Sequence, residues 1–239
     1  MNTQVLVFLA SCAILWSLES AVPLYRFRGN RLRHALPNVA LTVLVLLTSV
    51  ALSFVTAAAA SYAKTTLVDV LIGIVALDFF AYVAHVTLHS LPLGWRFHRV
   101  HHSEEEVDVT TALRQHPGET VWRVLWQLPA IVLVGVPLWV VVVYLTISSL
   151  NAQLEHANLR VPERVDRMLR LLFVTPNMHK VHHSRQQSET DSNYANIFSI
   201  WDRIFGTYTR RVDFATLRYG LDDVEVRSLR GLLAMPFRS

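Results

Sequence analysis

Histidine occurs twice in the pattern H-x-x-H-H, first as H-R-V-H-H and later in the chain as H-K-V-H-H. The two copies consist of His98, His101 and His102, and of His179, His182 and His183. Offsets of three and four residues place side chains on one face of a helix, so each copy presents several imidazoles in one direction. Converging imidazoles are a typical binding site for a transition metal ion. The repeated pattern therefore predicts a metal centre built from both copies.

A further histidine pair ends an apolar segment just before the first copy. His85 and His89 continue a polar stripe that begins with Asp78 and Tyr82, since the four positions follow helical spacing. Ionisable groups within a membrane segment are costly to bury and usually serve function. We expect His85 and His89 to be ligands, and Asp78 and Tyr82 to support them or to line a substrate path. The alternative is that Asp78 pairs with another helix for packing.

The number of histidines bears on the kind of metal site. Eight imidazoles in three clusters exceed the four ligands of one tetrahedral zinc ion and suit two metal ions with open positions. Imidazole binds zinc, copper, iron and nickel, so ligand type alone does not select the metal. H-E-x-x-H and G-x-S-x-G do not occur in the sequence, which disfavours zinc proteases and serine hydrolases. Bis-histidine haem is disfavoured because it uses single facing histidines.

Three histidines lie outside these clusters. His156, in L-E-H-A-N, follows an apolar segment that returns the chain to the same side, and it is a candidate ligand. For His116, in R-Q-H-P-G-E, we expect a supporting or structural role. His34 lies in a basic segment, and we expect no metal role for it.

The composition is that of a membrane protein. Of the 239 residues, 52% are hydrophobic, and the mean hydropathy is +0.34. The single cysteine, Cys12, permits neither an internal disulfide nor a multi-thiolate metal site. The formal net charge is +4, but the basic residues flank apolar segments. They therefore indicate topology and lipid headgroup contact rather than nucleic-acid binding.

Apolar segments define the expected membrane helices. These segments are residues 5–18, 36–60, 67–88 and 119–150. The first is short for a span, so we expect a membrane helix or a re-entrant segment rather than a signal peptide. The last is broken by Gly135 and Pro137 and predicts two helices in a hairpin. We expect an all-α integral membrane bundle of about four to five apolar helices with a histidine-rich metal-binding cap.

Charge orients this bundle. Of the 22 lysines and arginines, only Lys64 falls on the far side, so the histidine clusters are expected on the cytoplasmic side. We expect one domain over residues 1–239. It would comprise N-terminal membrane helices in 1–64, a catalytic core in 65–210 and a cytoplasmic tail in 211–239.

The motifs, taken in order, resemble those of the fatty acid hydroxylase/sterol desaturase superfamily. They are D-F-F-A-Y-V-A-H-V-T-L-H, H-R-V-H-H-S, R-Q-H-P-G-E, L-E-H-A-N, H-K-V-H-H-S, D-S-N-Y-A-N and W-D-R-I-F-G-T-Y, over about residues 70 to 210. The resemblance implies a non-haem di-iron membrane oxidoreductase that uses O2 to hydroxylate or desaturate lipids or sterols. It implies as iron ligands His85, His89, His98, His101, His102, His156, His179, His182 and His183. Asn193 and Asp202 would support the ligands or cap local structure. Val86 and Ala195 depart from the usual pattern without removing a ligand.

An enzyme of this kind needs a lipid substrate from the bilayer and an external electron donor of the cytochrome b5 or ferredoxin type. A basic run could bind an acidic redox protein or, equally, lipid headgroups. The run is Arg160, Arg164, Arg167 and Arg170. Two alternatives stay open: a zinc-dependent membrane hydrolase that consumes no O2, and a non-enzymatic membrane metal-binding or transport protein. The sequence does not choose the substrate, or hydroxylation over desaturation.

Overall fold

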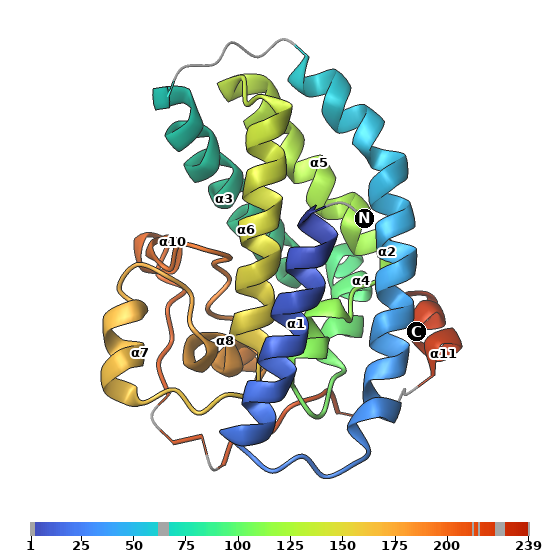
Figure 1. The fold of residues 1–239 in the computed structure, drawn as a ribbon, viewed down its shortest axis with the longest axis vertical. Coiled ribbons are helices and arrows are strands. Elements are labelled where there is room, and N and C mark those ends of the chain that lie inside the picture. Colours follow the sequence, from blue (N-terminus) through green and yellow to red (C-terminus); the bar gives the residue numbers. More distant parts are fainter. Residues whose placement is uncertain (1–2, 62–66, 212, 215, 223–227, 239) are drawn as a thin grey trace.

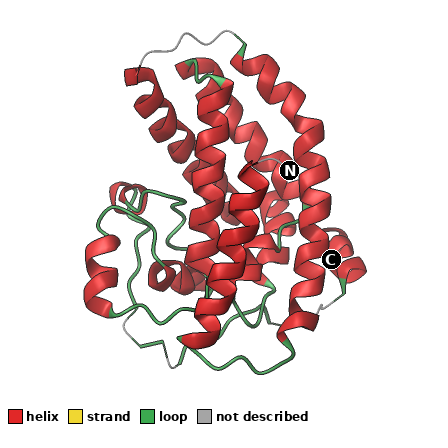
Figure 2. Cartoon of the chain, viewed as in Figure 1, coloured by secondary structure: helices red, strands yellow, loops and turns green. Residues whose placement is uncertain are grey.

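Five long helices and eight short ones form the part of the chain that the structure describes (Figure 1). The computed structural model describes residues 3–61, 67–211, 213–214, 216–222 and 228–238. The long helices are α1 (Thr3–Ala21), α2 (Arg31–Ala60), α3 (Leu67–Ser90), α5 (Pro117–Val134) and α6 (Leu138–His156). The short ones are α4 (Pro92–His102), η1 (Val109–Leu113), α7 (Glu163–Leu169), α8 (Pro176–His182), α9 (Gln187–Thr190), α10 (Ile200–Ile204), α11 (Leu229–Ala234) and η2 (Met235–Phe237). Figure 2 shows helices and loops throughout these described ranges, which confirms the predicted all-α bundle.

Four of the long helices, α1, α2, α3 and α6, are long and apolar enough to cross a bilayer. Large apolar side chains on their outer faces are exposed, with Phe54 of α2 at 76% and Leu71 of α3 at 69%. Such surfaces are unfavourable in water and suit contact with lipid. The finding supports an integral membrane protein, while the side that the histidines face stays a prediction.

The first helix is longer than the sequence pattern predicted. We expected a segment that ends near Leu18 and is short for a span, but α1 continues to Ala21. The extension depends on Glu19, whose buried carboxylate accepts hydrogen bonds from the backbone N–H groups of Val109 and Asn158 and pairs with Arg31. A carboxylate with several partners can be buried within a helix, so a polar residue did not end this one.

The hairpin between α5 and α6 forms where the sequence predicted it. Gly135 has φ +75°, the left-handed conformation that ends a helix with little strain for glycine. Its N–H donates to the carbonyl of Ile131 and closes the last turn. Pro137 then precedes the first turn of α6. Both helices contribute to one buried cluster that includes Leu77 of α3, Ile131 of α5 and Tyr144 of α6.

The basic segment after α1 is partly helical. Asn30 caps α2 by accepting a hydrogen bond from the N–H of Arg33, so α2 begins at Arg31, before the predicted apolar segment. Lys64, on which the predicted orientation partly rests, lies outside the described residues.

α4 turns back closely against the end of α3. A Cβ atom at Gly94 would lie 2.6 Å from the carbonyl oxygen of Thr87 and 2.8 Å from the Cα of Leu88. Only glycine fits at such a close approach of two backbones. The contact brings the start of α4 beside the histidines at the end of α3.

The short helices flank the long ones on two sides. In Figure 1, α7, α8 and α10 lie beside the lower part of α6, and α11 lies on the opposite side near α2. Leu232 of α11 and Met235 pack against Leu41 of α2 and Val100 of α4 in a buried cluster. The last part of the chain is therefore packed on the bundle. A division at residues 64 and 210 stays a prediction.

Candidate metal centre

Nine histidines from four helices meet at the lower ends of α3 and α6. Among the described residues they form two groups of possible metal ligands, and the ligand atoms of each group lie within 4.8 Å of one another. The first group is His85, His89, His98, His102 and His182, and the second is His101, His156, His179 and His183. All nine predicted ligands fall in these groups.

The adjacent histidines of each H-x-x-H-H pattern belong to different groups. His98 and His102 of α4 join the first group, whereas His101 joins the second. α8 shows the converse arrangement. Residues four apart share a helix face, whereas consecutive residues point about 100° apart. The doubled histidine therefore lets one helix supply ligands to two neighbouring sites.

The spacing of the ring nitrogens fits metal coordination. His98 Nε2 lies 3.1 Å from His85 Nε2 and 3.2 Å from His102 Nε2. In the second group, the Nε2 atom of His156 lies 3.0 Å from those of His101, His179 and His183. One neutral imidazole carries a single N–H, so hydrogen bonds cannot satisfy so many converging nitrogens. Ligands about 2.1 Å from one ion and 90° apart would lie about 3.0 Å from each other.

Backbone carbonyls orient several of the ligands from behind. The Nδ1–H of His85 donates to the carbonyl of Tyr194 (2.8 Å), that of His101 to the carbonyl of Arg114 (3.2 Å), and that of His182 to the carbonyl of Ser192 (2.7 Å). A proton held at Nδ1 leaves Nε2 free to bind a metal ion and fixes the ring orientation.

Two carboxylates behind the histidines were missed in the sequence. Glu119 Oε2 lies 3.0 Å from His98 Nδ1, and Arg123 in turn holds the same carboxylate at 2.8 Å. Asp191 accepts a hydrogen bond of 3.3 Å from His89 Nδ1. Carboxylates in this position raise the basicity of a metal-binding imidazole. The sequence contained a signal for Glu119, because this acidic residue directly follows H-P-G at the start of an apolar segment. It contained no comparable signal for Asp191.

Burial keeps the imidazoles in the form that binds metal. Desolvation is the largest cause that lowers the pKa well below the ordinary histidine value at six positions. These are His98, His101, His102, His179, His182 and His183. Metal ions bind the neutral ring, so no proton has to be displaced from these sites at neutral pH.

Asp78 lies away from the histidines. Its carboxylate accepts hydrogen bonds from the backbone N–H groups of Ile197 (3.0 Å) and Phe198 (3.0 Å) and from Trp201 Nε1 (2.8 Å). Tyr144 also donates to it, at 3.3 Å. These partners fit the packing alternative, in which Asp78 joins α3 to the segment that leads into α10.

Asp202 is connected to His85, a candidate ligand, through one intermediate residue. It accepts hydrogen bonds from the backbone N–H groups of Tyr194 (2.7 Å) and Ala195 (3.0 Å), and the Tyr194 carbonyl is the acceptor for His85. Burial raises the pKa of Asp202 to about 6. Asn193 stands next to Ser192, the acceptor for His182, and has a positive φ of 54°.

The side chain of Asn193 fixes this turn. It donates to the carbonyls of Met178 (3.1 Å) and Thr209 (2.8 Å) and accepts from the Thr209 N–H (3.0 Å). Asparagine tolerates the left-handed region better than most residues. Ala195, the departure noted in the sequence, is not among the positive-φ residues of the described chain.

Tyr82 lies between the histidines and an exposed aromatic ring. Its hydroxyl is 3.0 Å from Thr207 Oγ1, and its ring stacks on Phe205 with centroids 5.4 Å apart. Tyr194 follows at 6.5 Å, and the Tyr194 ring lies 5.0 Å from that of His89. Phe205 is 52% exposed, so the row of rings runs from the surface to the first histidine group.

The two remaining histidines belong to neither group. His116 Nδ1 accepts a hydrogen bond from the Gly118 N–H and caps α5, which is a structural role. His34 lies 3.4 Å from Asp108 and 3.5 Å from Glu104.

Lys180, within the second H-x-x-H-H copy, joins α8 to the end of α6. Its fully buried Nζ donates to the carbonyls of Glu155 (3.2 Å), His156 (2.7 Å) and Ala157 (2.8 Å). The last carbonyls of a helix have no partners within the helix, so one ammonium group satisfies three of them. Burial lowers its pKa to about 7.

We expect Lys180→Met to lower stability by about 2–3 kcal/mol, because three buried carbonyls would lose their donor. His156 and the histidines of α8 would lose their common support, so metal content should fall as well. Arg99→Met is the matched control, because Arg99 occupies the same position in the first copy and is only half-buried, and its side chain makes no hydrogen bond or ion pair within the described residues. Thermal unfolding and elemental analysis check both variants, and equal losses in both would contradict the role of Lys180.

The chain is similar in sequence to known proteins. A family model described as fatty acid hydroxylase matches residues 70–207, more than half of the chain. The chain is 31% identical over 170 residues to an ornithine lipid hydroxylase, OlsE, of Rhizobium tropici, which covers 71% of this chain and 50% of that protein. It is 33% identical over 134 residues to alkylglycerol monooxygenase of Homo sapiens, which covers 55% of this chain and 28% of that protein.

Another relative, of lower identity, is named for a different activity. The chain is 28% identical over 145 residues to the very-long-chain aldehyde decarbonylase GL1-6 of Oryza sativa subsp. indica, which covers 57% of this chain and 22% of that protein. The chain spans half or less of the length of these relatives. No solved structure matches it.

Proposed function

The chain belongs to the fatty acid hydroxylase family, and from this membership we propose that it is a di-iron membrane enzyme that uses O2 to oxidise a C–H bond of a lipid. The observation that carries the proposal is the pair of buried histidine groups, which share α4 and α8 and fit one metal ion each. Relatives named as lipid hydroxylase and monooxygenase support the reaction class. We favour hydroxylation because of those names.

Iron suits this proposal better than zinc. Zinc has no redox chemistry, whereas insertion of an oxygen atom from O2 requires electron transfer. Bound iron would supply O2 activation and one-electron redox chemistry. The ligands of the first site would be His85, His89, His98, His102 and His182, and those of the second His101, His156, His179 and His183.

The residues of the chain have three tasks in this reaction. Burial of the histidines excludes bulk water from the place where the C–H bond reacts. Glu119 and Asp191 orient His98 and His89 from behind. Tyr194 packs on the rings of the first group and limits how a substrate can approach them.

A lipid would reach the site from the side of the bundle. Exposed apolar residues of α3, such as Leu71 and Val75, and of α10, such as Ile204, form adjoining surfaces suited to lipid. The row from Phe205 through Tyr82 to Tyr194 leads inward from there. We propose that the apolar chain of the substrate approaches along these rings, which support positioning of its reacting carbon.

We also propose that the histidine end faces the cytoplasm. The loop between α1 and α2 carries Arg26 and Arg28, and further arginines follow α6 on the same end of the bundle. Short loops rich in lysine and arginine remain on the cytoplasmic side of a membrane.

Elemental analysis of detergent-purified protein, expressed with iron and without added zinc, tests the metal. We expect about two irons per chain, and O2 consumption with a lipid extract and a reductant. Zinc without iron, together with lipid turnover that needs no O2, would contradict the oxygenase and favour a hydrolase.

A further inference from the structure

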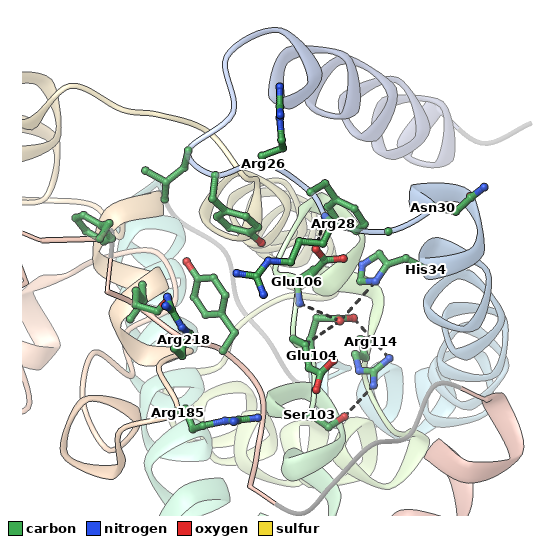
Figure 3. A pocket seen from close by; sticks show the side chains of 18 of the residues that line it. Arg26, Arg28, Asn30, His34, Ser103, Glu104, Glu106, Arg114, Arg185 and Arg218 are labelled. Atoms are coloured by element: carbon green, nitrogen blue, oxygen red, sulfur yellow. Dashed lines mark hydrogen bonds and ion pairs between the residues drawn. The ribbon is translucent and has the colours of Figure 1, made fainter.

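A cleft of about 1470 Å³ opens where the loop between α1 and α2 faces the C-terminal part of the chain (Figure 3). Its walls come from residues 24–30 and the start of α2, from residues 103–106 after α4, and from Phe214 and residues 217–219. Tyr25 and Tyr219 pack together in one wall, with ring centroids 5.6 Å apart. The cleft is separate from the proposed lipid path, which lies on the α3 and α10 side.

The cleft is strongly basic. Seven arginines and three glutamates line it, a formal charge of +4 with His34 neutral. Besides Arg114, the lining arginines are Arg26, Arg28, Arg33, Arg160, Arg185 and Arg218. Within the described residues, the guanidinium groups of Arg26, Arg33 and Arg160 make no ion pair or hydrogen bond. A concave surface of one charge attracts and steers a partner of opposite charge.

The acidic residues of the cleft are engaged with neighbouring groups. Glu104 lies 3.6 Å from Arg114 and 3.5 Å from His34 at the base. A carboxylate oxygen of Glu106 accepts a hydrogen bond from the backbone N–H of Arg28. Figure 3 shows Glu104, Arg114 and Ser103 close together, with Arg28 and Arg218 on different sides of them. Arg185 pairs with Asp222 outside the lining, so Arg26, Arg33 and Arg160 supply the positive charge that no carboxylate among the described residues offsets.

The base of the cleft adjoins the second histidine group. The Arg114 guanidinium lines the cleft and donates to Ser103 Oγ at 2.9 Å, while its backbone carbonyl accepts from His101 Nδ1 at 3.2 Å. Ser103 directly follows His102 in the chain. Arg114 is therefore the one residue that separates a molecule bound in the cleft from His101, a proposed ligand.

The position of the cleft relative to the His101 ring indicates what kind of molecule could bind in it. The cleft lies behind Nδ1, whereas the proposed metal-binding atom, Nε2, faces the other histidines. A substrate in the cleft would meet the back of a ligand and could not present its C–H bond to the metal. An electron donor needs no direct contact with the metal, so this position suits a reductant.

The proposed reaction requires such a donor. Hydroxylation balances as R–H + O2 + 2e⁻ + 2H⁺ → R–OH + H2O, so two of the four electrons that reduce O2 come from the C–H bond and two from outside. A one-electron redox protein would supply them in two encounters. We propose, on the basis of the proposed function, that this arginine-lined cleft docks an acidic one-electron redox protein that reduces the metal centre through the Arg114–His101 contact.

The sequence left open whether the arginine run after α6 binds a redox protein or lipid headgroups, and the structure divides that run. Arg160 lines the cleft. Arg170 is buried against Glu163 and Asp166 and is not available to a partner. Arg164 and Arg167 lie on α7 among exposed apolar residues such as Met168, a pattern suited to lipid headgroups.

The test uses the iron-loaded protein in nanodiscs of neutral phosphatidylcholine and, as the probe, an acidic plant-type [2Fe–2S] ferredoxin. We expect the double variant Arg28→Glu/Arg160→Glu to raise the Kd for ferredoxin at least about tenfold and to reduce its dependence on salt. The control Arg167→Glu/Arg230→Glu makes the same charge change at exposed positions outside the cleft and should bind ferredoxin within about twofold of the unaltered protein.

Anaerobic stopped-flow measurement separates docking from the function itself. Reduced ferredoxin should transfer electrons to the ferric centre more slowly in the cleft variant, while photoreduced deazaflavin, a small donor, should reduce all variants equally. Normal reduction by deazaflavin with unaltered ferredoxin binding in the cleft variant overturns the docking site and leaves the proposed function standing. The same holds if both double variants lose ferredoxin binding equally. A centre that neither donor reduces overturns the proposed function as well.

Discussion

His182→Ala is expected to leave no more than about one metal ion per chain and to reduce lipid turnover by more than 100-fold. Removal of a group that merely supports a ligand typically costs about 10–100-fold, so loss of a ligand should exceed that. His183→Ala should lose one ion as well, but from the other site, because His182 and His183 belong to different groups. Elemental analysis and O2 consumption with a lipid extract measure the two effects.

His116→Ala is the matched control for these ligand variants. It removes an imidazole of the same chain that caps α5 and belongs to neither group. We expect it to retain both ions and most of the activity. Two ions and normal turnover in His182→Ala would contradict the ligand assignment. Loss of metal in His116→Ala would show that His116 supports the centre, a role that the sequence left open.

Asp78→Ala is expected to destabilise the fold by on the order of 3 kcal/mol while the folded fraction keeps its metal. The substitution leaves the N–H groups of Ile197 and Phe198 and the indole N–H of Trp201 without an acceptor in a buried place. For a chain of this length the change corresponds to about 10 °C in Tm. Thermal unfolding in detergent, with metal measured per folded chain, checks both parts.

Asp78→Asn provides the graded control, because its amide oxygen can still accept from the backbone while the negative charge is lost. We expect its Tm to lie between those of the unaltered protein and Asp78→Ala. A variant at this position that loses metal without losing stability would contradict the packing role and support the alternative, in which Asp78 acts on the ligands.

The sequence was sufficient for the class of fold, and it named the nine histidines that the structure brings together as candidate ligands. The H-x-x-H-H pattern is local, because helix geometry alone determines which of its side chains share a face. The break at Gly135 and Pro137 was equally local, and the structure confirms it. The resemblance to the hydroxylase superfamily is confirmed by the family match, while the iron, the electron donor and the cytoplasmic orientation stay proposals.

Only the tertiary structure decided how these parts combine. It divided His101 from His102 between two sites, placed Glu119 behind His98, and gave Glu19 the partners that extend α1. It also gathered arginines from distant segments into one cleft. A periodic pattern is fixed by a few neighbouring residues, whereas the partner of a buried charge can be any group that the fold brings within a few ångströms. Spacing along the chain therefore identified the candidate ligands, whereas tertiary packing determined which residues support and surround them.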